Sequence, residues 1–230
     1  MINYKEMKKI SVLFATVIIA LQCEEALTED PPGFLVNENF YNNEQDALSA
    51  LNSVYSIFNV GGGYPVNWFM ALLENRADYS NGRGSQIPMS TYDQPLDNTN
   101  QTRVFDAYDD IYDAINRANT VISKVPLIDM NEDVRAQYVA EARFLRAFFY
   151  STLVKYWGSV PLRDEPFTNL NQVAMPKASI SDLWEFIEND LLIAIPDLAN
   201  SFSDSQSGRA TSWAGKMLLA DLYLNIENWT

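Results

Sequence analysis

The longest periodic pattern of apolar positions lies mid-chain, between Tyr138 and Leu162. Apolar side chains recur there at spacings of three and four, which predicts one amphipathic helix with a buried face. Gly158 suits a helix C-cap and Pro161 cannot continue a helix, so we expect the helix to end near residue 158. The expected buried stripe comprises Tyr138, Ala142, Leu145, Phe149, Leu153 and Tyr156, widened by Phe144 and Phe148. The residues expected to keep the other side solvated are Glu141, Arg143, Arg146 and Lys155.

Shorter periodic segments on both sides predict further helices. Before the central helix we expect one from Asn43 to the glycines at 61–63, a short one around 68–73, and one over 105–125. After it we expect a helix over 179–196, with Ser179 and Asp182 as a capping box, and a last helix capped by Thr211. Inward-facing positions of the 105–125 helix and the last helix are Phe105, Tyr108, Ile111, Tyr112, Ile115, Ala118 and Ile122, and Trp213, Met217, Ala220 and Leu224. With no convincing strand pattern, the sequence predicts an all-α domain of paired helices, similar to tetratricopeptide repeats.

The stretch from Asp78 to Thr102 is the least regular part of the chain, rich in Gly, Pro, Asn, Asp and Ser. Irregular segments of this length in compact domains are usually functional or disordered. Tyr79 and Tyr92 could stack on the apolar faces of sugars while Asn81 and Arg83 bond their hydroxyls, so these four residues are candidate ligand-binding residues. A solvated or partner-contacting loop is the alternative.

Composition excludes several kinds of chemistry. Lys and Arg number 16 against 30 Asp and Glu, a net charge of −14, which argues against nucleic-acid binding. The chain has no His, the commonest general base and metal ligand. The glycines at 61–63 lack the Lys-Ser/Thr of a phosphate-binding loop, and residues 129–140 carry Val134 and Ala140 where a calcium loop needs Gly and Glu. We therefore expect no metal or cofactor, and read 128–134 as a polar turn that caps the central helix.

The N-terminal segment has the features of a bacterial lipoprotein signal. Lys5, Lys8 and Lys9 precede a weakly polar to apolar run over 10–21 that is too short to span a bilayer, and Cys23, the only cysteine, follows. We expect residues 1–22 to be a signal peptide, Cys23 to be the lipid attachment site, and residues 23–42 to be a tether. A plain signal sequence with an incidental cysteine is the alternative, and Gln22 departs from the small residue preferred before a lipidated cysteine.

Several segments carry a family resemblance. They are RFLRA at 143–147, YWG at 156–158, VPL at 160–162, the P-K-A-S run that begins at Pro176, and GRAT at 208–211. In this order they resemble the SusD/RagB family, surface nutrient-binding lipoproteins of the Bacteroidetes outer membrane. The resemblance implies that residues 43–230 are a SusD-like N-terminal helical domain of a protein more than twice as long, ending at Thr230 partway through a repeat. Glu24 and Glu25 resemble the surface-export signal of such lipoproteins.

The resemblance also implies a function. Such a protein binds glycans or similar oligomers outside the cell and delivers them to a SusC-like TonB-dependent transporter, with no covalent chemistry. Because the 78–102 stretch contains no Trp, starch is not implied as the ligand. A helical-repeat scaffold that only contacts partner proteins is the alternative, and exposed tyrosines in that stretch would favour binding. An enzyme using two carboxylates is a third possibility, but no carboxylate pair stands out.

Overall fold

The computed structural model describes residues 40–59, 74–84, 87–91, 102–167 and 174–226. Within these ranges the chain forms helices and no strand, apart from one antiparallel bridge between Pro161 and Lys177. The chain divides into two units, Met1–Phe40 and Tyr41–Thr230, and all the described helices belong to the second. The all-α class predicted from periodicity is therefore confirmed in the described part of the chain.

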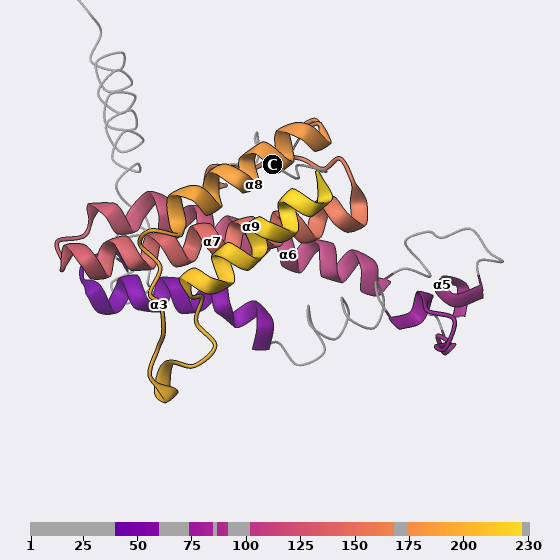
Figure 1. Ribbon diagram of the computed structural model, residues 1–230, viewed down its shortest axis with the longest axis horizontal. Coiled ribbons are helices and arrows are strands. Elements are labelled where there is room, and N and C mark those ends of the chain that lie inside the picture. The colour runs from indigo at the N-terminus through magenta and orange to yellow at the C-terminus, as the bar shows by residue number, and fades with distance from the viewer. Residues whose placement is uncertain (1–39, 60–73, 85–86, 92–101, 168–173, 227–230) are drawn as a thin grey trace, which may run out of the picture. The chain divides into compact units, whose positions relative to one another are not determined.

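A long hairpin of two helices forms the centre of this unit (Figure 1). Helix α6 spans Thr102–Lys124, the 3-10 turn η5 spans Val125–Leu127, and α7 spans Glu132–Trp157. Asn131 caps α7 by accepting a hydrogen bond from the Val134 backbone N–H, as the polar turn before it predicts. At the other end Gly158 is the C-cap with φ +70°, a left-handed conformation that glycine adopts without a Cβ clash.

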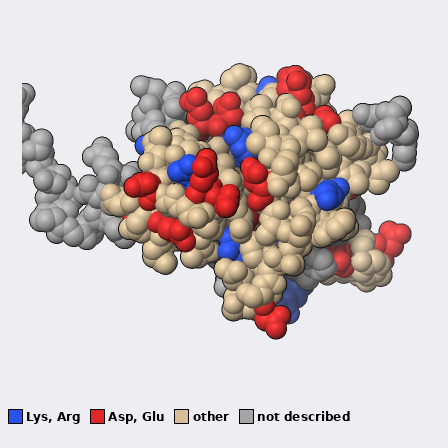
Figure 2. All heavy atoms as spheres, turned by 60° about the vertical axis from the view of Figure 1, so that its left-hand side comes forward, with Lys and Arg blue, Asp and Glu red and all other residues tan. Residues whose placement is uncertain are grey.

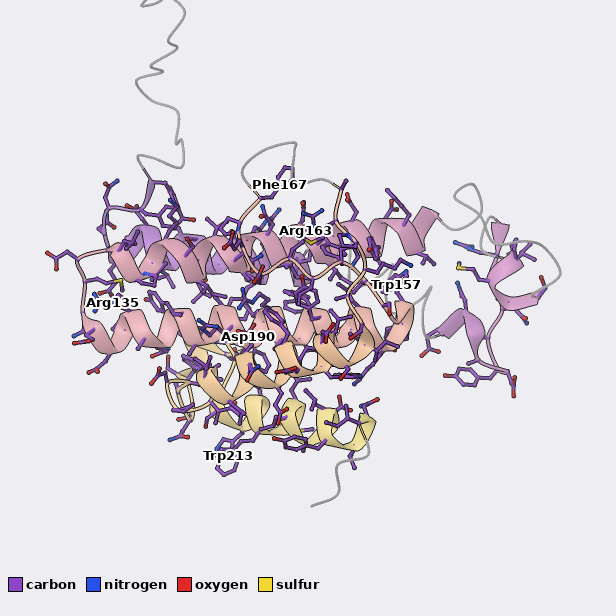
Figure 3. The ribbon with its side chains drawn as sticks, turned by 90° about the horizontal axis from the view of Figure 1, so that it is seen from above. Arg135, Trp157, Arg163, Phe167, Asp190 and Trp213 are labelled. Carbon is purple, nitrogen blue, oxygen red and sulfur yellow. The ribbon has the colours of Figure 1, made fainter. Side chains whose placement is uncertain are left out.

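The remaining helices pack around α7. Helix α3 (Glu44–Tyr55) and its continuation η1 (Ser56–Asn59) contact α6 and α7, and α8 (Ile180–Ala194) lies along α7. Helix α9 (Ser212–Asn225) packs on α8, so α6, α7, α8 and α9 follow one another from one side to the other (Figure 3). Short helical segments occur at η3 (Glu74–Arg76), α5 (Ile87–Thr91) and η7 (Asp204–Gln206).

The core combines bulky side chains of α7 with small ones of α6. Phe149, Leu145 and Leu153 are fully buried, as the periodicity predicts, and Phe149 stacks on Phe58 with ring centroids 5.6 Å apart. The facing positions on α6 include three buried alanines, which let the two helix axes approach. The largest fully buried side chains on the other helices are Leu51, Met89, Ile111, Ile115, Leu183, Ile187 and Leu191.

Four predictions about helix faces are wrong. Tyr156, expected in the buried stripe of α7, is 38% exposed. Glu141 and Arg146, expected in solvent, have relative exposures of 0% and 4%. Phe105, expected inside, is 57% exposed. On α9 the expected inward stripe of Trp213, Met217, Ala220 and Leu224 faces solvent, and the buried positions are Ser212, Gly215 and Leu222.

Other predictions fall partly or wholly outside the described residues. The short helix around 68–73, the glycines at 61–63, the signal peptide, Cys23 and most of the tether all lie there. The 78–102 stretch is less irregular than predicted, because α5 forms at residues 87–91. The N-caps Ser179 and Thr211 are confirmed, since their hydroxyls accept hydrogen bonds from the Asp182 and Ala214 backbone N–H groups.

Candidate functional site

A buried arginine on α7 joins three elements. The Arg146 guanidinium donates to both carboxylate oxygens of Asp190 on α8, at 2.7 and 2.8 Å, and to Asn119 Oδ1 on α6, at 2.7 Å. It also donates to the Asp164 carbonyl at 3.0 Å, and Arg143 adds a 2.7 Å contact to Asp190. Because both charges of the Arg146–Asp190 pair are nearly inaccessible, the pair is tolerated only with these further hydrogen bonds.

The same region fixes the irregular segment that follows α7. The Asn119 amide donates to the Arg163 and Glu165 carbonyls, both at 3.0 Å, and Tyr112 Oη donates to the Pro161 carbonyl at 2.7 Å. Tyr150 Oη accepts from the Arg163 N–H at 2.6 Å. Side chains of α6 and α7 thus pair with several backbone polar groups of the segment from Pro161 to Glu165. Burial raises the pKa of the Tyr112 and Tyr150 phenols above the usual tyrosine value.

A second buried cluster holds the segment before α9. Arg209 donates to Glu141 Oε2 and Oε1 at 3.0 and 2.6 Å. Tyr55 on α3 donates to Glu141 Oε2 at 2.8 Å and accepts from the Ala210 N–H at 2.8 Å. The Arg209 guanidinium also lies over the rings of Tyr138 and Phe202. Burial, followed by the Glu141 charge, raises the pKa of Tyr55.

The four residues predicted to bind ligand lie in the segment between α3 and α6. Tyr79 is 81% exposed, and its Oη donates to Glu74 Oε2 at 3.1 Å. Asn81 and Arg83 are also exposed, whereas Tyr92 lies outside the described residues. Nearby, the Gly82 N–H donates to Ser90 Oγ at 2.6 Å, which ties this turn to α5. Three of the four candidates are therefore accessible to a ligand, and their grouping with Tyr92 stays a prediction.

A large hollow lies elsewhere, between α3 and the residues that precede α9. Its volume is about 670 Å³. Tyr55 and Phe58 line one wall, and residues 205–209 line the other. Sequence reasoning missed this site because its two walls are about 150 residues apart; the serine-rich stretch at 200–208 was the one available signal.

Metal-binding clusters and membrane-spanning helices are both absent from the described ranges. They contain no cluster of three or more Asp, Glu, Cys or His side chains placed to hold a metal ion. Among the same residues, no helix combines the length and apolar character needed to cross a bilayer. Figure 2 shows acidic side chains spread over one face with fewer basic ones between them, in keeping with the net charge of −14.

Comparison with known proteins identifies the class of protein to which this helical fold belongs. Residues 40–224 match the SusD-like family model described as starch-binding, associating with outer membrane. The chain therefore belongs to the SusD-like family, as the resemblance of its motifs predicts, and this family has the tetratricopeptide-like helical fold.

Relatives from two organisms support the assignment. SusD-like protein P25 of Formosa agariphila is 26% identical over 97% of this chain and 44% of its own length. A SusD-like protein of Bacteroides ovatus is 27% identical over 96% of this chain and 40% of its own. The chain thus spans less than half the length of these relatives.

Solved structures of SusD-like proteins support the same family assignment. A laminarin-binding SusD-like protein superposes with a TM-score of 0.67 at 31% identity, over 80% of this chain and 40% of the other. A SusD homolog of Bacteroides thetaiotaomicron gives a TM-score of 0.69 at 25% identity, over 84% of this chain and 38% of the other.

Proposed function

We propose that this protein is a surface-exposed outer-membrane lipoprotein that binds glycans or similar oligomers and delivers them to a SusC-like TonB-dependent transporter. The observation that carries the proposal is the match of residues 40–224 to a starch-binding, outer-membrane-associated family. The similar structure that binds laminarin favours a glycan as ligand. The protein acts by binding and release, without covalent chemistry, cofactor or metal.

Anchoring is the next part of the proposal. Residues 1–22 act as the signal peptide, Cys23 receives the lipid, and residues 23–42 tether the helical domain of 43–230 to the membrane. A single thiol in the whole chain makes the test simple. The full chain, expressed in a host that processes lipoproteins, should incorporate labelled palmitate and fractionate with outer membranes, and Cys23→Ala should abolish both.

The exposed residues after η3 are the proposed ligand contacts. Tyr79 offers a ring face, with Asn81 and Arg83 as neighbouring hydrogen-bonding groups and Tyr92 as a second ring. The test is binding of the full chain to a glycan panel that includes laminarin and starch. Tyr79→Ala with Tyr92→Ala should lower the affinity at least tenfold, whereas Trp213→Ala, a change of an exposed aromatic on α9, should leave it unchanged.

A scaffold without a ligand site in these residues is the second candidate. The exposed apolar side chains of α9, Trp213, Met217 and Leu224, favour it, since such stripes commonly contact other proteins. Glycan binding by the parent chain would exclude a pure scaffold. Failure to bind any glycan, together with capture of the transporter, would favour it.

A further inference from the structure

The hollow between α3 and the residues before α9 has the size of a small-ligand site. Its volume of about 670 Å³ lies inside the roughly 300–1,000 Å³ typical of such sites. On one side it is lined by α3 and η1, including Asn52 and Phe58. Residues 205–209 line the facing side; they belong to the loop that connects α8 to α9, at and after its η7 turn (Figure 1).

Buried side chains of α7 contact residues of both walls of this hollow. Tyr55 and Arg209 are each bonded to the buried Glu141 carboxylate, which therefore links one wall to the other. Phe58 stacks on Phe149 with 21° between the ring planes, and it keeps 38% of its surface exposed. Because these contacts are made by groups of the protein itself, we expect binding to require little ordering of Tyr55, Phe58 and Arg209.

The groups that line the hollow are those that recognise a polyhydroxylated ligand. Asn52 and Gln206 offer amides on opposite walls, and Ser205 and Ser207 offer hydroxyls. Amides and hydroxyls both donate and accept hydrogen bonds, so they pair with vicinal sugar hydroxyls. The exposed part of the Phe58 ring can contact the apolar C–H face of a sugar.

Charge restricts the ligand further. Arg209 is the only ionised side chain among the described residues that line the hollow, and its charge is matched by the bidentate contact to Glu141. The chain as a whole carries −14, which disfavours polyanions. Among the described residues, the lining thus offers no positive charge without a counter-charge that could bind a carboxylate or sulfate group of a ligand.

We propose that this hollow binds a short neutral oligosaccharide, through stacking on Phe58 and hydrogen bonds to Asn52 and Gln206. The inference rests on the proposed glycan-binding function and adds a site separate from Tyr79 and its neighbours. It also names the ligand class, which is an uncharged glycan rather than a polyuronate or a sulfated one.

The test uses calorimetric titration of the full chain with laminarin oligosaccharides as the neutral probe and oligo-alginate as the acidic one. Asn52→Trp places a bulky ring in the hollow from an exposed helix position, and Gln206→Ala removes one amide from the facing wall. The matched control is Gln45→Trp, which adds the same ring at an exposed position of α3 that does not line the hollow. Far-UV circular dichroism checks that each variant stays folded.

We expect both hollow variants to weaken laminarin-oligosaccharide binding at the hollow by about tenfold or more and to keep the binding event at Tyr79 and its neighbours, with Gln45→Trp unchanged and alginate binding much weaker throughout. Full binding by both hollow variants, lost instead with Tyr79→Ala, overturns the hollow as a site while leaving the proposed function intact. Equal affinity for alginate overturns the neutral ligand class. A parent chain that binds no glycan overturns both this inference and the proposed function.

Discussion

Arg146 on α7 and Asp190 on α8 face each other through two parallel hydrogen bonds, with Nε to Oδ2 at 2.7 Å and Nη2 to Oδ1 at 2.8 Å. They are 44 residues apart in sequence, and Figure 3 shows Asp190 on α8 where that helix lies against α7. This pair and the Glu141–Arg209 pair connect the helices to the two irregular segments.

Removal of the charge on Asp190 should destabilise the fold strongly. In Asp190→Asn the buried Arg146 guanidinium loses its counter-charge, a change that typically costs about 3–5 kcal/mol. Urea denaturation of the full chain measures the free energy of unfolding. The control is Asp113→Asn. Asp113 is exposed, and its Oδ2 lies 3.9 Å from Arg117 Nη2, so this substitution should lower the free energy of unfolding by no more than about 0.5 kcal/mol. Similar losses in both variants would contradict this prediction.

Neutralising Glu141 should release the segment before α9. Glu141→Gln leaves Arg209 without its carboxylate partner and weakens the bond to Tyr55, so we expect a loss of about 2–4 kcal/mol. Amide hydrogen exchange over residues 200–211 should speed up by at least tenfold relative to α6. Glu185→Gln, an exposed carboxylate on α8, should change neither quantity. Unchanged exchange in Glu141→Gln would show that the segment is held by other contacts.

Two glycines should resist substitution by alanine for different reasons. At Gly158 an added Cβ would meet only Ile180 Cδ1 at 3.9 Å, so Gly158→Ala costs about 1–2 kcal/mol through its φ of +70° alone. At Gly215 the added Cβ would lie 2.9 Å from Ile195 Cγ1, so Gly215→Ala costs about 1–3 kcal/mol by overpacking α9 against α8. Ile195→Ala removes the clashing Cγ1, so Gly215→Ala should cost less in the Ile195→Ala background, whereas the cost of Gly158→Ala should be the same in both backgrounds. Thermal denaturation of the single and double variants tests this difference.

Alkaline pH should unfold the protein through its buried tyrosines. Burial raises the pKa of Tyr55, Tyr112 and Tyr150, so the folded state keeps these phenolic protons where the unfolded chain, with a pKa of about 10, releases them. The contribution of these raised pKa values to the free energy of unfolding is therefore fully present below about pH 10. Above that pH the free energy of unfolding falls by about 1.4 kcal/mol per pH unit for each tyrosine.

Urea denaturation between about pH 8 and pH 11, with tyrosinate absorbance recorded in parallel, measures this effect. Tyr112→Phe should reduce the slope above pH 10, because one of the three raised pKa values is removed. A flat stability profile, or tyrosinate absorbance from all tyrosines in the folded chain, would contradict the assignment.

The exposed stripe of α9 should promote self-association. Trp213 is 64% exposed and Met217 78% exposed on the same face, which leaves apolar surface in contact with water. Trp213→Glu with Met217→Lys should raise the concentration at which association appears in sedimentation velocity, with little change in stability. Phe105→Glu, which removes an exposed apolar ring from α6, serves as the control. Association unaffected by the α9 changes would mean that another surface is responsible.

The sequence by itself determined the long helices of the described residues and several of their ends, but not the short helix α5. Spacings of three and four selected the buried Leu145, Phe149 and Leu153, and the caps at Asn131, Gly158, Ser179 and Thr211 depend on neighbours within four residues, which local sequence displays. The motifs at 143–147 and 208–211 pointed to the family that the comparisons establish.

Only the tertiary structure decided which charges are buried. Glu141 and Arg146 look like solvated positions because a charged side chain is stable inside only beside its partner, and the partners Arg209 and Asp190 lie 68 and 44 residues away. Likewise, the apolar pattern of α9 could not tell which face meets α8, since Gly215 permits the close approach that turns Trp213 outward. Local periodicity indicates whether a side chain suits a buried or an exposed position. The packing of segments that are distant in the sequence determines which residues it contacts.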